Sequence, residues 1–132
     1  MLRERALKIV LVVVGLLFLA LVYPMTMFFS RDPALAMMLS IYVTLGIFLL
    51  WAARNPPANR SLIAFTAWSS FAHAAIMGAQ AYLKVVEREE LIGVAVLILI
   101  GVLLLMLAPL KAGGGPGLAS LPAMAKPARP LD

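Results

Sequence analysis

Residues 61–83 read S-L-I-A-F-T-A-W-S-S-F-A-H-A-A-I-M-G-A-Q-A-Y-L, a stretch of 23 residues that contains no Asp, Glu, Lys or Arg. An α-helix needs about 20 predominantly apolar residues to cross a hydrocarbon layer of about 30 Å. The stretch also lacks the apolar–polar alternation that is typical of a membrane-barrel strand. Inside lipid its backbone groups can be paired within the segment only if it is helical. The sequence therefore predicts a transmembrane helix here.

Three further uncharged stretches of similar length accompany this one. They cover residues 9–30, 33–53 and 91–110, which are 22, 21 and 20 residues long. The whole chain is 64% apolar and 13% charged, whereas a soluble domain is about half apolar and about a quarter charged. The loops between the stretches are short, so consecutive helices should be antiparallel neighbours. We predict an all-α, four-helix transmembrane bundle of up-down-up-down topology in residues 1–110, with spans at about 9–29, 33–53, 61–83 and 91–110.

The basic residues are distributed unevenly between the two sides of the predicted membrane. Eight lie in the N-terminus, the second loop and the C-terminal tail, whereas the first and third loops contain three. Cytoplasmic loops carry an excess of Lys and Arg, so we expect both termini to be cytoplasmic. Nucleic acid is not an expected partner, because these residues do not cluster on a folded polar surface. The partner that this composition implies is the lipid bilayer.

The ends of the chain and of the spans carry local signals. The first apolar stretch is longer than the h-region of a signal peptide, and no cleavage pattern follows it, so cleavage is not expected. Asp32 and Pro33 are typical of an N-cap and a first helical residue. Residues 111–132 are rich in Gly and Pro and predict a disordered cytoplasmic tail. The chain has no cysteine, which excludes disulfides and thiolate metal sites.

Polar side chains follow one face of the third predicted span. At about 100° per residue, one stripe collects Thr66, Ser69, Ser70, His73, Met77 and Gln80. His73 is the only histidine of the chain. Polar groups at membrane depth are destabilising unless another polar group or a water-filled cavity meets them. We therefore expect this stripe to face the interior of the bundle.

Two interpretations of the stripe remain open. In the first, its side chains only join helices, since Ser, Thr and Gln contacts in membranes contribute about 0.6 kcal/mol each. In the second, the stripe lines a site for an apolar or amphipathic small molecule, because such sites combine apolar walls with a few convergent polar groups. Residues of the first two spans that could support such a site are Tyr23, Thr26, Ser40, Thr44 and Trp51.

Metal binding and catalysis are less well supported by the residues. His73 and Met77 are suitable ligands for haem or copper and share a helical face, but the number of ligands is too low. Ser69 and Ser70 lie on the face of His73, yet no intramembrane acid orients the imidazole. We therefore expect no metal and no cofactor, and a membrane redox or isomerase-type enzyme is the least favoured function. An interaction or scaffold subunit, in a homo-oligomer or with a membrane partner, is the main alternative to a binding protein.

The stretch from Ser40 to Tyr82 also carries a resemblance. It contains I-Y-V-T-L-G-I-F-L-L at residues 41–50 and W-S-S-F-A-H-A-A-I-M-G-A-Q at residues 68–80. Both strings resemble a family of small bacterial integral membrane proteins of unknown function, and the architecture is loosely similar to that of DoxX-like proteins. This resemblance implies a multi-pass protein of the bacterial inner membrane and supplies no activity, cofactor or catalytic residue.

Overall fold

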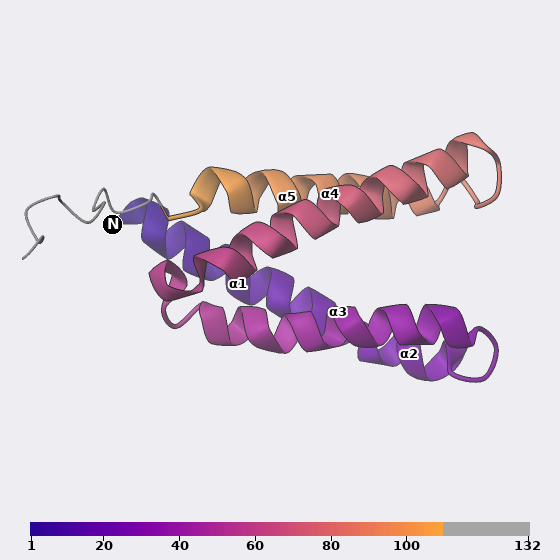
Figure 1. Cartoon of the computed structure of the whole chain (residues 1–132), viewed down its shortest axis with the longest axis horizontal. Coiled ribbons are helices and arrows are strands. Elements are labelled where there is room, and N and C mark those ends of the chain that lie inside the picture. Colours follow the sequence, from indigo (N-terminus) through magenta and orange to yellow (C-terminus); the bar gives the residue numbers. More distant parts are fainter. Residues whose placement is uncertain (110–132) are drawn as a thin grey trace, which may run out of the picture.

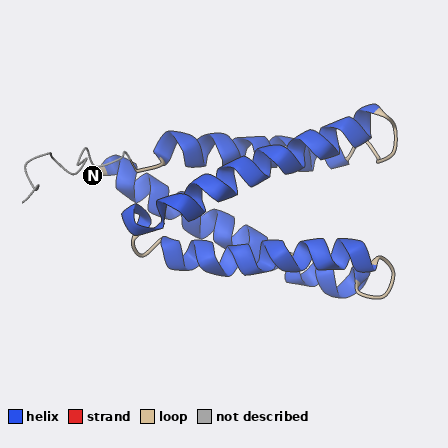
Figure 2. Ribbon diagram, viewed as in Figure 1, coloured by secondary structure: helices blue, strands red, loops and turns tan. Residues whose placement is uncertain are grey.

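The computed structural model describes residues 1–109, which fold into helices joined by short loops (Figure 2). No strand occurs in this part of the chain. Four helical segments are long and apolar enough to cross a membrane, which confirms the predicted all-α, four-helix architecture. The tail predicted for residues 111–132 lies outside the described residues. The helices are α1 (Leu2–Ala20), α2 (Val22–Phe28), α3 (Pro33–Ala52), the 3₁₀ helix η1 (Pro56–Asn59), α4 (Arg60–Tyr82) and α5 (Glu90–Leu107).

The first span consists of two helices, because the chain contains a proline near its end. Pro24 has no backbone N–H, and its ring clashes with the carbonyl four residues earlier, which is that of Ala20, the last residue of α1. At the break between the two helices, the N–H of Leu21 bonds to the carbonyl of Phe18, three residues earlier, at 3.2 Å. At its other end α1 begins at Leu2, before the uncharged stretch, and an ion pair between Lys8 and Glu4 at 2.9 Å stabilises this added turn.

Local capping fixes the start of α3 and the end of α4. The carboxylate of Asp32 accepts a hydrogen bond from the N–H of Leu35 at 3.0 Å, and Pro33 is the first helical residue, so the predicted N-cap is confirmed. After α4, the N–H of Val85 bonds to the carbonyl of Gln80 at 2.9 Å, and that of Lys84 bonds to Ala81 at 3.1 Å. This is a Schellman motif, which usually has glycine at the position of Lys84. Lys84 adopts a φ of 59°, so the short loop holds it in a left-handed conformation that is unfavourable for a side chain.

The helices are arranged as two antiparallel hairpins. The first pairs α1 and α2 with α3, and the second pairs α4 with α5. Figure 1 shows that the hairpins meet at the end that holds the N-terminus and η1, and diverge toward the loops at residues 29–32 and 83–89. Contacts within each hairpin far outnumber those between α3 and α4. Two consecutive helices of the chain, α3 and α4, therefore form only a sparse seam between the hairpins.

The core lies where the hairpins converge. Four side chains with no exposed surface, one from each spanning helix, belong to the same hydrophobic cluster: Leu11, Leu49, Ile63 and Leu104. At the adjacent membrane end, the Arg3 guanidinium donates hydrogen bonds of 2.9 Å to the carbonyls of Met106 and Ala108. A cation at these carbonyls satisfies the end of α5 and complements its dipole. The first and last helices are thereby joined at this end of the protein.

Candidate functional site at the seam between α3 and α4

The polar stripe of α4 begins in the core. Thr66 and Ser70 are fully buried, and their hydroxyls donate to carbonyls of the same helix. Thr66 bonds to the carbonyl of Leu62 at 2.9 Å, and Ser70 bonds to that of Thr66 at 2.7 Å. Ser69, which is half-buried, also donates to the carbonyl of Thr66, at 3.1 Å. All three hydroxyls are thus satisfied within α4, and none of these bonds joins two helices.

His73 lies one helical turn beyond Ser69, in the seam between the hairpins. Its imidazole contacts the ring of Tyr42 on α3 edge-on, with ring centroids 5.3 Å apart and planes at 72°. Tyr42 in turn contacts Phe18 on α1, at 5.2 Å and 82°. These three rings form an aromatic row that connects α1, α3 and α4. Because the contacts between α3 and α4 are sparse, the pair of Tyr42 and His73 is one of the few contacts that join these two helices.

Neither polar ring of the aromatic row uses its hydrogen-bonding groups within the described part of the chain. The side-chain hydrogen bonds of residues 1–109 include no partner for the Tyr42 hydroxyl or the His73 imidazole. No fully buried side-chain nitrogen or oxygen among these residues lacks a partner, so the polar atoms of Tyr42 and His73 are accessible at the protein surface. In hydrocarbon an unpaired polar group of this kind is destabilising. The Tyr42 hydroxyl and the His73 imidazole are therefore polar groups that have no hydrogen-bond partner among residues 1–109 and lie in an apolar environment.

The far end of the stripe does not reach these two groups. Met77 is half-buried and lies against α5, where its methyl group is 3.4 Å from the position that a Cβ of Gly93 would occupy. Gln80 is exposed. The stripe thus passes from the core through the seam to an exposed position, because α4 diverges from α3 along its length (Figure 1).

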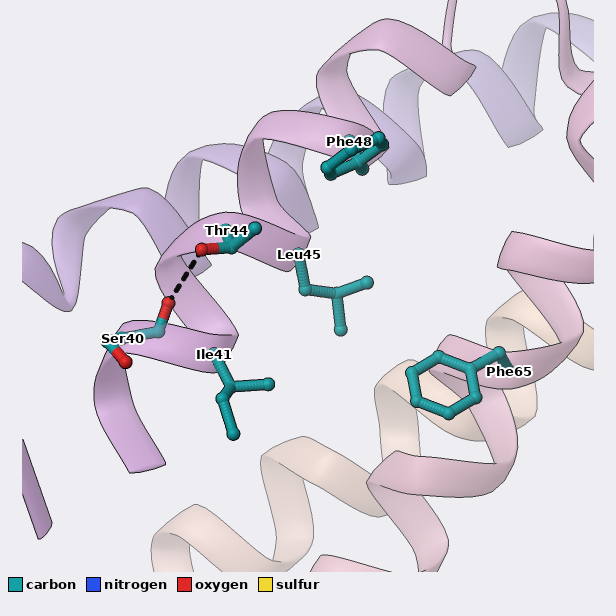
Figure 3. A pocket seen from close by; sticks show the side chains of 6 residues that line it. All are labelled: Ser40, Ile41, Thr44, Leu45, Phe48 and Phe65. Carbon is teal, nitrogen blue, oxygen red and sulfur yellow. Dashed lines mark hydrogen bonds between the residues drawn. The ribbon is translucent and has the colours of Figure 1, made fainter. Parts of the chain in front are cut away.

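A shallow, largely open pocket of about 280 Å³ lies in the same seam. Figure 3 shows Phe65 of α4 across from five side chains of α3. The walls are predominantly apolar, and the two hydroxyls among them are already bonded within α3: Ser40 to the carbonyl of Met37 at 2.6 Å and Thr44 to that of Ser40 at 2.9 Å. The lining consists of Ser40, Ile41, Thr44, Leu45, Phe48 and Phe65.

The pocket and the aromatic row occupy neighbouring turns of the same two helices. Leu45 follows Tyr42 by three residues on α3, which is about one turn. Phe65, Ser69 and His73 follow one another at intervals of four residues, so they lie on one ridge of α4. The pocket is therefore about two turns of α4 closer to the converging end than His73 is.

The remaining residues that the sequence indicated lie elsewhere. Tyr23 and Thr26 are exposed on α2, and Thr26 donates to the carbonyl of Tyr23 at 2.8 Å. Trp51 is exposed and stacks on Phe48, with ring centroids 6.5 Å apart. Only Ser40 and Thr44 of the supporting set line the pocket. Tyr42 and Phe65 were not among the candidates. Tyr42 stood in the string that carries the family resemblance, and that string was the only signal for it.

The arrangement of the seam bears on the other chemistries that the residues could support. Ser69 and Ser70 both donate to the carbonyl of Thr66, so neither hydroxyl is held by His73 as a nucleophile would be by its base. Within residues 1–109, no three His, Asp or Glu side chains gather as a metal site would require. What the seam offers is an apolar pocket beside two polar rings.

Comparisons with known proteins bear on the chain as a whole. A family of unknown function, DUF6632, matches residues 3–115, which include the seam and all the described helices except Leu2, the first residue of α1. Searches of curated proteins and of solved structures find no match. With most of its length matched and four helices that can span a membrane, this chain belongs to the DUF6632 family.

Proposed function

We propose that this membrane protein binds an apolar or amphipathic small molecule in the seam between α3 and α4. The observation that carries the proposal is the combination of an open apolar pocket with two unpaired polar rings on neighbouring turns of the same helices. Small-molecule sites are mostly apolar clefts with a few placed polar groups, with volumes from about 300 Å³ upward. At about 280 Å³ the pocket lies just below that range, which suits part of a slender molecule.

The internal hydrogen bonds of α4 favour a binding site over a purely structural role of the stripe. Polar residues that join membrane helices do so by hydrogen bonds across the interface. Here the three hydroxyls of the stripe bond within their own helix, so they contribute no such bonds. The polar groups of the seam without a hydrogen bond among residues 1–109 are those of Tyr42 and His73, whose rings meet between α3 and α4. A ligand that bonds to them would remove the cost of leaving them unpaired.

Filling the pocket provides the test of this function. Thr44→Trp should lower the amount of bound lipophilic molecule about tenfold, because a large side chain then occupies the space between α3 and Phe65. Thr44 is exposed, so the substitution leaves the core intact. The measurement is mass spectrometry of small molecules that remain with the purified protein. The matched control is Ile47→Trp, since Ile47 is also exposed on α3 but does not line the pocket.

The possible results separate the two main functions. Loss of a bound lipophile in Thr44→Trp but not in Ile47→Trp supports the binding protein. If both variants and the unaltered protein carry no small molecule, the binding function is wrong. A change in self-association in that case would favour an interaction or scaffold subunit.

The orientation that accompanies this proposal has both termini in the cytoplasm of a bacterium. The basic residues at the converging end support it, because Arg3, Arg5, Lys8, Arg54 and Arg60 all lie in or next to the ends of spans there. A reporter that is active only in the periplasm, fused after Leu107, should therefore be inactive. The same reporter inserted after Glu87, in the loop at the opposite end, should be active. The reverse pattern would contradict the orientation.

A further inference from the structure

We infer that the molecule bound in the seam is a neutral lipophile, with a single apolar chain in the pocket and an oxygen that accepts a hydrogen bond from Tyr42. This inference rests on the proposed function and specifies the chemistry of its ligand. Three features of the seam carry it: the lack of free polar groups in the pocket, the fixed position of the Tyr42 ring, and the depth of that ring in the membrane.

The pocket itself selects an apolar group. Its two hydroxyls, those of Ser40 and Thr44, already donate to carbonyls of α3. Their neighbours in the wall are the aliphatic and aromatic side chains of Ile41, Leu45 and Phe65. A polar head group placed there would lose its water without gaining a hydrogen-bond donor. A chain of methylene or isoprene type fits both this lining and a volume of about 280 Å³.

The Tyr42 hydroxyl is the best-placed donor for the polar end of such a molecule. Edge contacts with Phe18 on one side and His73 on the other hold its ring between α1 and α4. A rigid ring presents its hydroxyl at little further cost in conformational entropy. His73 adds one donor and one acceptor as a neutral imidazole. The Tyr42 hydroxyl should therefore donate to an oxygen of the ligand, and His73 can support a second hydrogen bond.

The depth of Tyr42 excludes a charged head group. Tyr42 lies nine residues from Pro33 and ten from Ala52, so it is near the middle of α3, about 14 Å from either end. Charges at such a depth are costly unless they are paired. The pocket and the aromatic row contain no Asp, Glu, Lys or Arg that could pair with one. Phospholipid head groups and fatty-acid carboxylates are thus poor candidates, whereas ketones, esters and alcohols are compatible.

The test compares three probes of equal chain length, added to the full-length protein in phosphatidylcholine nanodiscs. They are an n-alkane, a long-chain methyl ketone labelled with ¹³C at its carbonyl, and the fatty acid measured as its carboxylate. We expect the ketone to bind about tenfold more tightly than the alkane, as one net hydrogen bond provides. The carboxylate should bind more weakly than either. The ketone carbonyl should also show a changed ¹³C shift when bound.

Tyr42→Phe isolates the hydrogen bond, because it keeps the ring between Phe18 and His73 and removes only the hydroxyl. It should lower the affinity for the ketone about tenfold, abolish the carbonyl shift and leave alkane binding unchanged. Tyr23→Phe is the matched control, since Tyr23 is exposed on α2 away from the seam.

Each alternative result contradicts a defined statement. Equal affinities for alkane and ketone, or an unchanged carbonyl shift in Tyr42→Phe, would show that Tyr42 does not hold the head group, while the binding function would stand. Tighter binding of the carboxylate would show that the head group is not neutral. Failure of all three probes to bind would contradict the proposed function itself.

Discussion

Gly46→Ala is expected to lower the free energy of unfolding by about 2 kcal/mol. A Cβ at Gly46 would lie 2.7 Å from the carbonyl oxygen of Gly15 and 2.9 Å from the backbone nitrogen of Leu19. These are backbone atoms of α1, so the clash can be relieved only if the two helices separate. Overpacking typically costs about 1–3 kcal/mol, and a clash with two backbone atoms belongs at the upper end of that range, at about 3 kcal/mol. The better helix propensity of Ala offsets about 1 kcal/mol of the total.

The control for this prediction is a glycine of the same chain that has free space around it. No atom lies within 4 Å of the Cβ that Gly78→Ala would add to α4. Gly78→Ala should therefore be neutral or stabilise the protein by up to about 1 kcal/mol. Unfolding in mixed detergent micelles, titrated with a denaturing detergent and followed by circular dichroism, measures both variants. If Gly46→Ala and Gly78→Ala unfold alike, the close approach of α1 and α3 is wrong.

Close approach at small residues is the general way in which membrane helices associate, since lipid removes the hydrophobic contribution between them. In this protein the first hairpin uses it at Gly15 and Gly46. The second hairpin uses a variant, because the ring of Phe71 on α4 lies over Gly101 on α5, with its Cε1 only 2.6 Å from a would-be Cβ. Each hairpin is therefore a tightly packed unit, whereas α3 and α4 make few contacts with each other.

The four spans could be predicted from the sequence because their determinants are local. The lengths of the uncharged stretches and the pair Asp32–Pro33 depend on neighbouring residues alone. The break at Leu21 follows from Pro24 in the same way. The divergence of the hairpins could not be predicted, since it depends on contacts between helices far apart in the sequence, such as those of the cluster that contains Leu11 and Leu104.

The environment of the polar stripe changes along α4. A helical wheel assigns one environment to a whole helical face. This assignment is valid only where the neighbouring helix runs alongside over the full length of that face. Here α4 crosses its partners and diverges, so Thr66 is buried, His73 is in the seam and Gln80 is exposed. The hydroxyls of the stripe do not need a partner on another helix, because each donates to a carbonyl of α4. They could therefore be satisfied on any face of this helix. Tyr42 could not be selected from α3 by polarity, since its partners come from two other helices.

Leu104→Ala is the second substitution expected to have a large effect, with a loss of about 2 kcal/mol. Leu104 has no exposed surface and belongs to the cluster that joins all four spanning helices. Substitutions of Leu by Ala in soluble cores cost about 2–5 kcal/mol, which combines a transfer term with a cavity term. In a membrane the separated helices remain in lipid, so mainly the packing term is lost. The expected cost is therefore near the low end of that range.

Leu99→Ala on the same helix is the matched control, because Leu99 is 57% exposed and leaves no cavity when truncated. It should change the stability by less than about 0.5 kcal/mol. The chain contains no cysteine, so spin labels attached at Ser30→Cys and Glu87→Cys would be the only two in the protein. The distance between them reports the separation of the diverging ends of the two hairpins. Since the cluster around Leu104 is where the hairpins meet, Leu104→Ala should broaden the distribution of this distance, and Leu99→Ala should not. Equal distributions and equal stabilities in the two variants would show that the hairpins are held together elsewhere than in this cluster.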